Sequence, residues 1–180
     1  MGARHAHGFS LVEVMVALIV CSVGLLGLAK MESLAIASTD VAGTRALAAM
    51  EASSLAAMMH ANRAYWGGGF ALASTTVQVT SGAVVISNAS LTTVAACTST
   101  GSSACNYTQM AAYDLQNWGG LNGLQAMLPG YLATIACSTS GYPITCTIQI
   151  VWSENGVAIT PQQTQMTSLA LPTYTVYVEP

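Results

Sequence analysis

The first part of the chain is dominated by one long apolar run. From Phe9 to Ala29 there are 21 mostly apolar residues, and Ser10 and Glu13 interrupt the apolar character near the start. About 20 helical residues, at 1.5 Å each, cross the hydrocarbon core of a bilayer. A cleaved secretory signal has a basic start, an apolar core of about 7–15 residues and a small-residue cleavage site after that core. Here the apolar run is longer, and the glycine that ends the head MGARHAHG lies directly before the run. The pattern therefore predicts a retained transmembrane helix.

The helical pattern continues past this run. Residues 30–63 contain no proline and many strong helix formers, namely Ala, Leu, Met and Glu. Their apolar positions recur at roughly helical spacing, at Leu34, Val41, Leu47, Leu55 and Met58. We expect one helix from residue 10 to residue 63, ended by the glycines at 67–69. Its first half would lie in the membrane and its second half on a globular domain.

After the glycines the pattern changes to period 2, which is typical of strands. Residues 76–86 predict a hairpin around a Ser-Gly turn, and 108–128 predict a helical stretch that Gly119-Gly120 interrupts and Pro129-Gly130 stops. Further strands are expected at 131–137, 146–152 and 167–179. The sequence therefore predicts an α+β fold, in which a long N-terminal helix packs against a small antiparallel sheet.

The charge content excludes some classes of partner. Charged residues make up 6 % of the chain and the net charge is −3, against roughly 25 % charged residues in an ordinary soluble domain. The four Lys and Arg residues are scattered along the chain. This pattern offers no basic patch for nucleic acid.

Four of the five cysteines lie in the polar C-terminal part, at Cys97, Cys105, Cys137 and Cys146. In a segment with few charges and many Ser and Thr residues, they indicate disulfides formed in an oxidising compartment. We expect the pairs Cys137–Cys146 and Cys97–Cys105, although four cysteines allow three connectivities. A zinc site is the weaker alternative, because the spacings are not C-x₂-C and no histidine is near. Cys21, in the apolar run, is interpreted as a small apolar filler.

No catalytic constellation is visible. The acids beyond the long helix are Asp114, Glu154 and Glu179, and nothing in the sequence brings them together. The three histidines are His5, His7 and His60, and no phosphate-binding glycine motif is present. We therefore expect no enzyme activity, no cofactor and no metal.

Glu13 is the one feature that a simple membrane anchor leaves unexplained. An unpaired charge at the centre of a membrane helix costs about 2.5–3.5 kcal/mol on insertion scales, so such a residue is a functional-site hypothesis that needs a partner. If the chain were cut after Gly8, the new α-amine on Phe9 would lie four residues before Glu13, about one helical turn away. The amine could pair with Glu13 within the chain or in a neighbouring one.

The stretch G-F-S-L-V-E at residues 8–13, directly before the apolar run, resembles the processing signal of type IV pilins and type II secretion pseudopilins. The resemblance implies that a prepilin peptidase cuts after Gly8 and methylates Phe9. It also implies that Glu13 pairs with the N-terminal amine of a neighbouring subunit during assembly. The expected organisation is a leader at 1–8, a transmembrane and filament-core helix at 9–29, its amphipathic continuation at 30–63, and a periplasmic domain at 64–180.

The C-terminal part adds a second resemblance. The stretches AAYDLQNW, LPG and IQIVW are similar to minor pilins of the PilV family, the type IV pilus modification proteins. The matching positions are Asp114, Trp118, Leu128, Pro129, Gly130 and Trp152. We interpret them as structural, with Asp114 capping a helix start and the two tryptophans filling the core.

This resemblance implies a minor pilin that primes pilus assembly and sits at the tip. The protein would start in the bacterial inner membrane with a cytoplasmic N-terminus and later reach the cell surface. The implied partners are prepilin peptidase, the major and other minor pilins, the assembly platform and membrane lipid. Such filaments serve adhesion, twitching motility and DNA uptake. A minor pseudopilin of a type II secretion system and a one-span membrane protein with a periplasmic binding domain are the alternatives.

Overall fold

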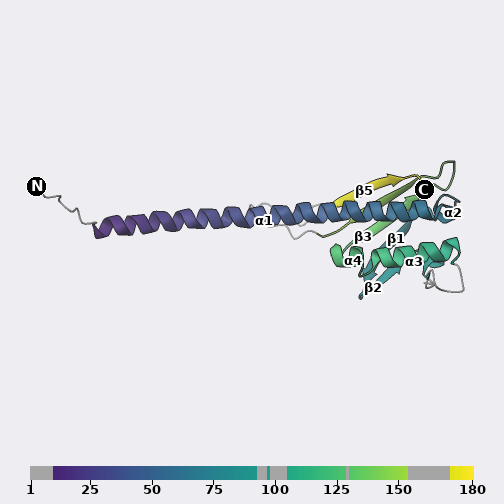
Figure 1. Ribbon diagram of the computed structural model, residues 1–180, viewed down its shortest axis with the longest axis horizontal. Helices are drawn as coiled ribbons and strands as arrows, with labels where there is room; N and C mark the ends of the chain where they lie inside the picture. Colours follow the sequence, from purple (N-terminus) through teal and green to yellow (C-terminus); the bar gives the residue numbers. More distant parts are fainter. Residues whose placement is uncertain (1–9, 93–96, 98–104, 129, 154–170) are drawn as a thin grey trace, which may run out of the picture. The chain divides into compact units, whose positions relative to one another are not determined.

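The computed structural model describes residues 10–92, 97, 105–128, 130–153 and 171–180 (Figure 1). The chain divides into two compact units, Met1–Asp40 and Val41–Pro180. The helix α1 (Leu11–Ala61) contributes to both units, and every other helix and strand belongs to the second. Each unit is therefore described by itself.

In the first unit, the described part of α1 packs against no other helix or strand. It begins where the Ser10 carbonyl accepts hydrogen bonds from the backbone N–H groups of Glu13 and Val14, at 3.0 and 3.3 Å. Its most apolar 18-residue stretch has a mean hydropathy of 2.5, and none of that stretch is buried. The helix is long and apolar enough to cross a membrane. This part of the chain leaves its apolar surface without a partner inside the described unit.

In the second unit, the same helix carries a buried stripe. Ala48, Ala52, Leu55 and Met59 are fully buried, and their spacing of three and four residues places them on one face. The helix ends at Ala61, close to the predicted end at residue 63. Beyond it, the short helix α2 (Arg63–Trp66) buries Tyr65 and Trp66. The glycines at 67–69 then follow as the sequence predicts.

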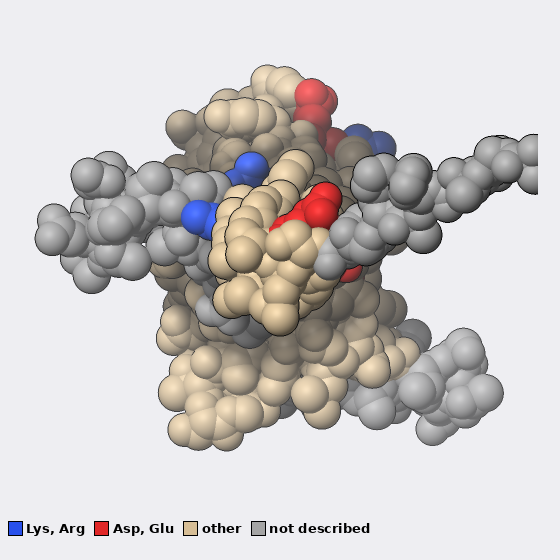
Figure 2. Space-filling model, turned by 90° about the vertical axis from the view of Figure 1, so that its left-hand side faces the viewer, with Lys and Arg blue, Asp and Glu red and all other residues tan. Residues whose placement is uncertain are grey.

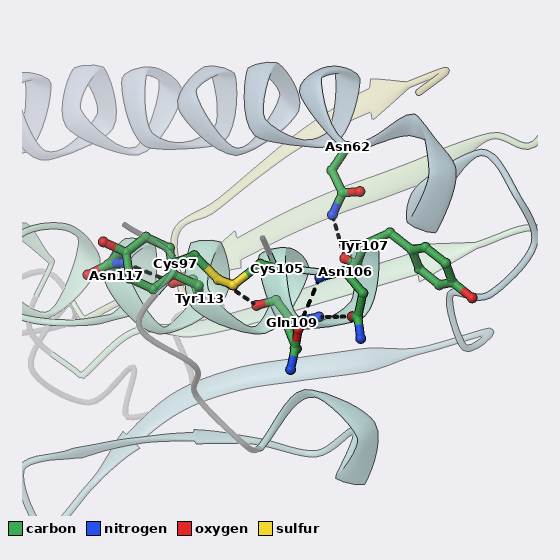
Figure 3. Close-up of a disulfide and its surroundings, with 8 residues drawn as sticks. All are labelled: Asn62, Cys97, Cys105, Asn106, Tyr107, Gln109, Tyr113 and Asn117. Atoms are coloured by element: carbon green, nitrogen blue, oxygen red, sulfur yellow. Dashed lines mark hydrogen bonds between the residues drawn. A yellow bond between two sulfur atoms is a disulfide. The ribbon is translucent and has the colours of Figure 1, made fainter. Parts of the chain in front are cut away.

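Asn62 separates the two helices, which is a break that helix propensity does not reveal. Its backbone leaves the helical region at φ −114° and ψ 53°. Its side-chain amide donates a hydrogen bond of 2.7 Å to the Tyr107 carbonyl (Figure 3). This bond ties the end of α1 to the start of the next long helix.

The five strands form one antiparallel sheet in the order β2-β1-β3-β4-β5. The strands are β1 (Thr75–Thr80), β2 (Ala83–Ile86), β3 (Leu132–Cys137), β4 (Cys146–Val151) and β5 (Thr173–Val178). The β1–β2 turn consists of Ser81 and Gly82, both with positive φ, at 51° and 81°. Such a turn matches the twist of the two strands, and glycine adopts it without strain. The predicted strands are thus present, although residues 167–170 of the last one lie outside the described residues.

One face of the sheet builds the core. On the central strands β3 and β4, alternate residues are buried, namely Ala133, Ile135, Cys137, Cys146, Ile148 and Ile150. The residues between them are partly or fully exposed, as period-2 alternation requires. The buried residues form one cluster with the buried stripe of α1 and with the helix α3 (Tyr107–Gly119). Figure 1 shows the strands behind these two helices. The predicted α+β fold, a long helix and a small antiparallel sheet, is confirmed.

The residue that caps the start of helix α3 is Asn106 and not Asp114, so the sequence-based interpretation of Asp114 as a helix cap is wrong. The Asn106 side chain accepts a hydrogen bond from the Gln109 N–H, and the Gln109 side chain accepts one from the Asn106 N–H (Figure 3). This reciprocal pair satisfies two free donors of the first turn. Asp114 lies in the middle of α3, whereas Trp118 and Trp152 are buried. The 3₁₀ turn η1 (Ala89–Leu91) and the short helix α4 (Leu124–Met127) complete the fold.

The C-terminal end of α3 approaches the sheet so closely that only glycine fits. A Cβ atom on Gly119 would lie 2.7 Å from the Tyr131 hydroxyl and 2.9 Å from Val77 Cγ1. The Tyr131 hydroxyl donates a 2.7 Å hydrogen bond to the Gly119 carbonyl. Burial raises the pKa of Tyr131 to about 12, so the donor stays protonated. At the other side of α3, Trp118 Nε1 donates to the Glu51 carbonyl at 2.9 Å, which fixes α3 against α1.

Candidate functional site at the N-terminus

The candidate site consists of the predicted cleavage position and the acid that follows it. Gly8 and Phe9 lie outside the described residues, so their predicted roles stay predictions. Glu13 is described, and it lies in the first turn of α1 with its side chain exposed. An acid in the first turn is favoured by the helix dipole, because the free N–H groups there carry partial positive charge.

The helix itself supplies no cation close to Glu13. The next basic residue along the chain is Lys30, which is 17 positions away, or about 25 Å along a helix. Within the described part of the helix, a charge partner for Glu13 is therefore not supplied by a nearby lysine or arginine.

The surface around Glu13 is apolar on every side of the helix. Leu11, Ile19 and Leu26 are 76 %, 61 % and 72 % exposed, and other large apolar side chains of the first unit are similarly exposed. A helix that is apolar all round is stable only in lipid or inside a bundle. Gly24 and Gly27 have open space where a Cβ would stand, so nothing in the described chain requires a glycine there. Cys21 is a free, exposed cysteine of the same surface.

The disulfides lie far along the chain from this segment, in the second unit. Cys137 and Cys146 are opposite each other on β3 and β4 and form a bond of 2.09 Å. Cys97 bonds to Cys105, the residue directly before the Asn106 cap, and its sulfur lies 3.7 Å from the Gln109 carbonyl oxygen (Figure 3). Both pairs are the ones that the sequence predicts. Each closes a short loop, for which the chain-entropy model gives about 2–3 kcal/mol of stabilisation.

The described residues offer little other reactive chemistry. No group of three His, Cys, Asp or Glu side chains in the described part of the chain could hold a metal ion. Figure 2 shows one face of the molecule, on which only a few charged side chains stand among uncharged ones. The buried Asn88 side-chain amide donates a hydrogen bond of 3.1 Å to the Tyr65 hydroxyl. These polar groups stabilise the fold and leave the N-terminal segment as the main functional candidate.

A groove between α1 and α3 is a feature that sequence reasoning missed. Its lining residues are Met58, Ala61, Asn62, Ala64, Cys105, Tyr107, Met110 and Asp114, and its volume is about 520 Å³. Burial raises the pKa of the Asp114 carboxyl. The helical spacing of residues 107, 110 and 114 could have placed them on one face, but no sequence signal shows that this face stays open towards α1.

Comparison with known families identifies the N-terminal segment. Residues 3–29 match the prokaryotic N-terminal methylation motif, the prepilin signal of type IV pilin-like proteins. The match covers the predicted cleavage position, Glu13 and the apolar run. No curated protein and no solved structure shows significant similarity to the chain. The motif is one of structural subunits that a prepilin peptidase processes and that assemble with other pilins. The N-terminal segment thus supports a type IV pilin-like or pseudopilin protein with one apolar anchoring helix.

Proposed function

We propose that the protein is a minor pilin of the PilV type, which takes part in priming and assembling the type IV pilus at its tip. Prepilin peptidase cleaves between Gly8 and Phe9 and methylates Phe9. The mature chain waits in the bacterial inner membrane with its domain in the periplasm, and the assembly platform then moves it into the pilus beside the major and other minor pilins. The methylation motif at residues 3–29 supports the processing and the pilin-like part of the proposal, and the resemblance of AAYDLQNW and IQIVW supports its PilV part.

The exposed apolar helix explains how one segment can serve both stages. Lipid tails and the apolar side chains of neighbouring helices are similar environments, so hydrophobic burial does not favour one over the other. Close packing and polar pairs decide the balance instead. Gly24 and Gly27 permit close approach of a second helix. Glu13 supplies a charge that is costly in lipid and favourable beside a cation.

In this mechanism Glu13 pairs with the N-terminal amine of the neighbouring subunit. The absence of any basic residue between Glu13 and Lys30 supports a partner outside the helix. We expect Glu13→Ala to be cleaved and methylated normally and to be incorporated poorly, because the charge pair is lost while the cleavage position is untouched. Mature protein in membranes and in sheared filaments is measured by quantitative immunoblotting. Glu32→Ala, on the same helix, is the matched control, and equal incorporation of both variants would contradict the pairing.

The second candidate function is a minor pseudopilin of a type II secretion system, which shares the N-terminal motif. The stretches AAYDLQNW and IQIVW favour the pilus. Deletion of the gene separates the two functions. Loss of surface pili with intact protein secretion supports the minor pilin, whereas loss of secretion with intact pili supports the pseudopilin.

A further inference from the structure

The groove between α1 and α3 combines an apolar floor with one acidic side chain. Met58 and Met110 line it, and Asp114 stands among its lining residues. The rim continues the apolar surface, since Tyr107 is 41 % exposed and stacks on Phe70, which is 56 % exposed, at 4.9 Å between ring centroids. Aromatic and methionine side chains are enriched in protein interfaces relative to other surfaces. The groove therefore has the composition of a docking surface.

Asp114 has an unfavourable position in the isolated chain. Burial alone shifts its pKa, upwards, and no neighbouring cation opposes the shift. Among the described residues its carboxylate has no hydrogen bond or ion pair. A partly buried carboxylate without a partner destabilises the folded chain. A charged residue that lowers the stability of the folded chain has no structural reason to be there. It is therefore a candidate for an interaction with another molecule.

Among the described residues, no lysine or arginine is a charge partner of Asp114, whose pKa is shifted by burial. Of its four basic residues, Arg4 lies in the predicted leader, and Lys30 and Arg45 precede Met58 on α1 by many residues. Arg45 lies 13 positions before Met58, or about 20 Å along the helix. Arg63, on α2, donates to the Pro180 carbonyl at 3.2 Å. The segment 98–104, TSTGSSA, contains no charged residue.

We propose that this groove binds an arginine or lysine side chain of a neighbouring protein subunit. The aliphatic part of that side chain lies against Met58 and Met110, and its cation pairs with Asp114. Long basic side chains suit such a site because they combine an apolar stem with a charged head. The choice of a filament subunit as the neighbour rests on the proposed function, whereas the chemistry of the groove does not.

The first experiment uses a defined probe and the full mature chain in nonionic detergent. The chain is labelled at the methionine methyl groups, and N-acetyl-arginine amide is titrated while methyl signals are followed by NMR. We expect saturable shifts at Met58 and Met110, and none at the exposed Met50. N-acetyl-citrulline amide has nearly the same shape without the charge, and should bind roughly tenfold more weakly. Equal binding of both probes, or no shift at the groove methionines, would overturn the proposal.

Two variants test whether the Asp114 carboxylate is the group that pairs with the cation of the probe. Asp114→Asn should abolish the preference for the arginine probe, whereas Glu179→Gln, at an exposed acid of the C-terminus, should retain it. The signal of the fully buried Met59 reports whether each variant is folded. An unchanged preference in a folded Asp114→Asn chain would show that Asp114 is not the partner and would refute the proposed pair.

A second measurement separates this proposal from the proposed function. In cells, Asp114→Asn should be cleaved at Gly8 like the natural chain, and should reach sheared filaments in reduced amounts. If the natural chain is never cleaved, the minor-pilin function fails and the titration alone decides the groove. If Asp114→Asn is cleaved and incorporated normally, the groove does not bind a filament subunit.

Discussion

The two parts of α1 both carry leucines, but these leucines have opposite surroundings. In the first unit Leu25 is 67 % exposed, whereas in the second unit Leu55 is fully buried among core residues of the same chain. The buried face of the second part packs against the sheet and α3. The first part has apolar side chains on all sides, so its surroundings must come from lipid or from other subunits. The comparison teaches that one continuous helix can contribute to a domain core in one part and leave its apolar surface exposed in the other.

The largest effect is expected from a substitution at the predicted cleavage position, because it should prevent formation of the mature N-terminus. Gly8→Val places a β-branched side chain at the predicted cleavage position, where the natural chain has glycine. We expect complete loss of the mature N-terminus, while the second unit folds as before. Mass spectrometry of the membrane fraction measures the cleaved share. Gly2→Val, in the same leader, is the control and should be processed normally; continued cleavage of Gly8→Val would refute the site.

A matched pair of leucines tests the contrast between the two parts of α1. Leu55→Ala leaves a cavity in the core and should lower the free energy of unfolding by about 2–5 kcal/mol. Leu25→Ala removes the same atoms from an exposed position and should change it by less than about 0.5 kcal/mol. Denaturant unfolding of the full chain in detergent, followed by near-UV circular dichroism, gives both values. Similar losses for the two variants would mean that the first part is also packed within the chain.

A pair of glycines sharpens the same contrast. Gly119→Ala would place a Cβ within 3 Å of Tyr131 and Val77, and we expect a loss of about 1–3 kcal/mol in the free energy of unfolding. Gly24→Ala meets open space and should leave the unfolding of the second unit unchanged. Thermal unfolding of both variants checks the difference. A Gly119→Ala protein as stable as the natural chain would contradict the close approach of α3 to the sheet.

The smallest effect concerns the charge of Asp114. Its folded pKa is raised above the ordinary 3.8, so the folded chain binds this proton more tightly than the unfolded chain. Its contribution to stability therefore falls as pH rises from about 3.8 through the raised folded value. Asp114→Asn should be more stable than the natural chain at neutral pH by less than about 1 kcal/mol, since water screens a partly exposed carboxylate. The difference should vanish at low pH in a series of denaturation curves; a less stable variant at neutral pH would refute the destabilising role.

The sequence predicts most of the fold because its patterns are local. Apolar periodicity indicates the long helix, alternation indicates the strands, and Ser81-Gly82 indicates the hairpin turn. The break at Asn62 could not be predicted, because it depends on a hydrogen bond to Tyr107, which lies 45 positions further along the chain. The sequence predicts a helical stretch from residue 108, close to the observed start of α3 at Tyr107, but the cap at Asn106 was not predicted. Its N-x-x-Q capping pair is visible in the sequence, but the pattern becomes specific only when the side chains of Asn106 and Gln109 bond to each other's backbone N–H groups.

The sequence indicates the candidate site where that site is a linear motif. Gly8, Phe9 and Glu13 are neighbours in the sequence, and the methylation motif covers all three. The groove at Asp114 was not predictable, because its walls come from two helices that meet only in the folded chain. Whether a carboxylate is partly buried without a partner depends on residues distant in the sequence.

The most direct test of the central claim is the mass of the N-terminal peptide in sheared surface filaments. The account predicts a peptide that begins at a methylated Phe9 and continues through Glu13 into the apolar helix. This result would establish that the apolar segment is retained and carried into an assembly. A chain that begins at Met1 or Gly2, or mature protein that never leaves the membrane fraction, would contradict the account.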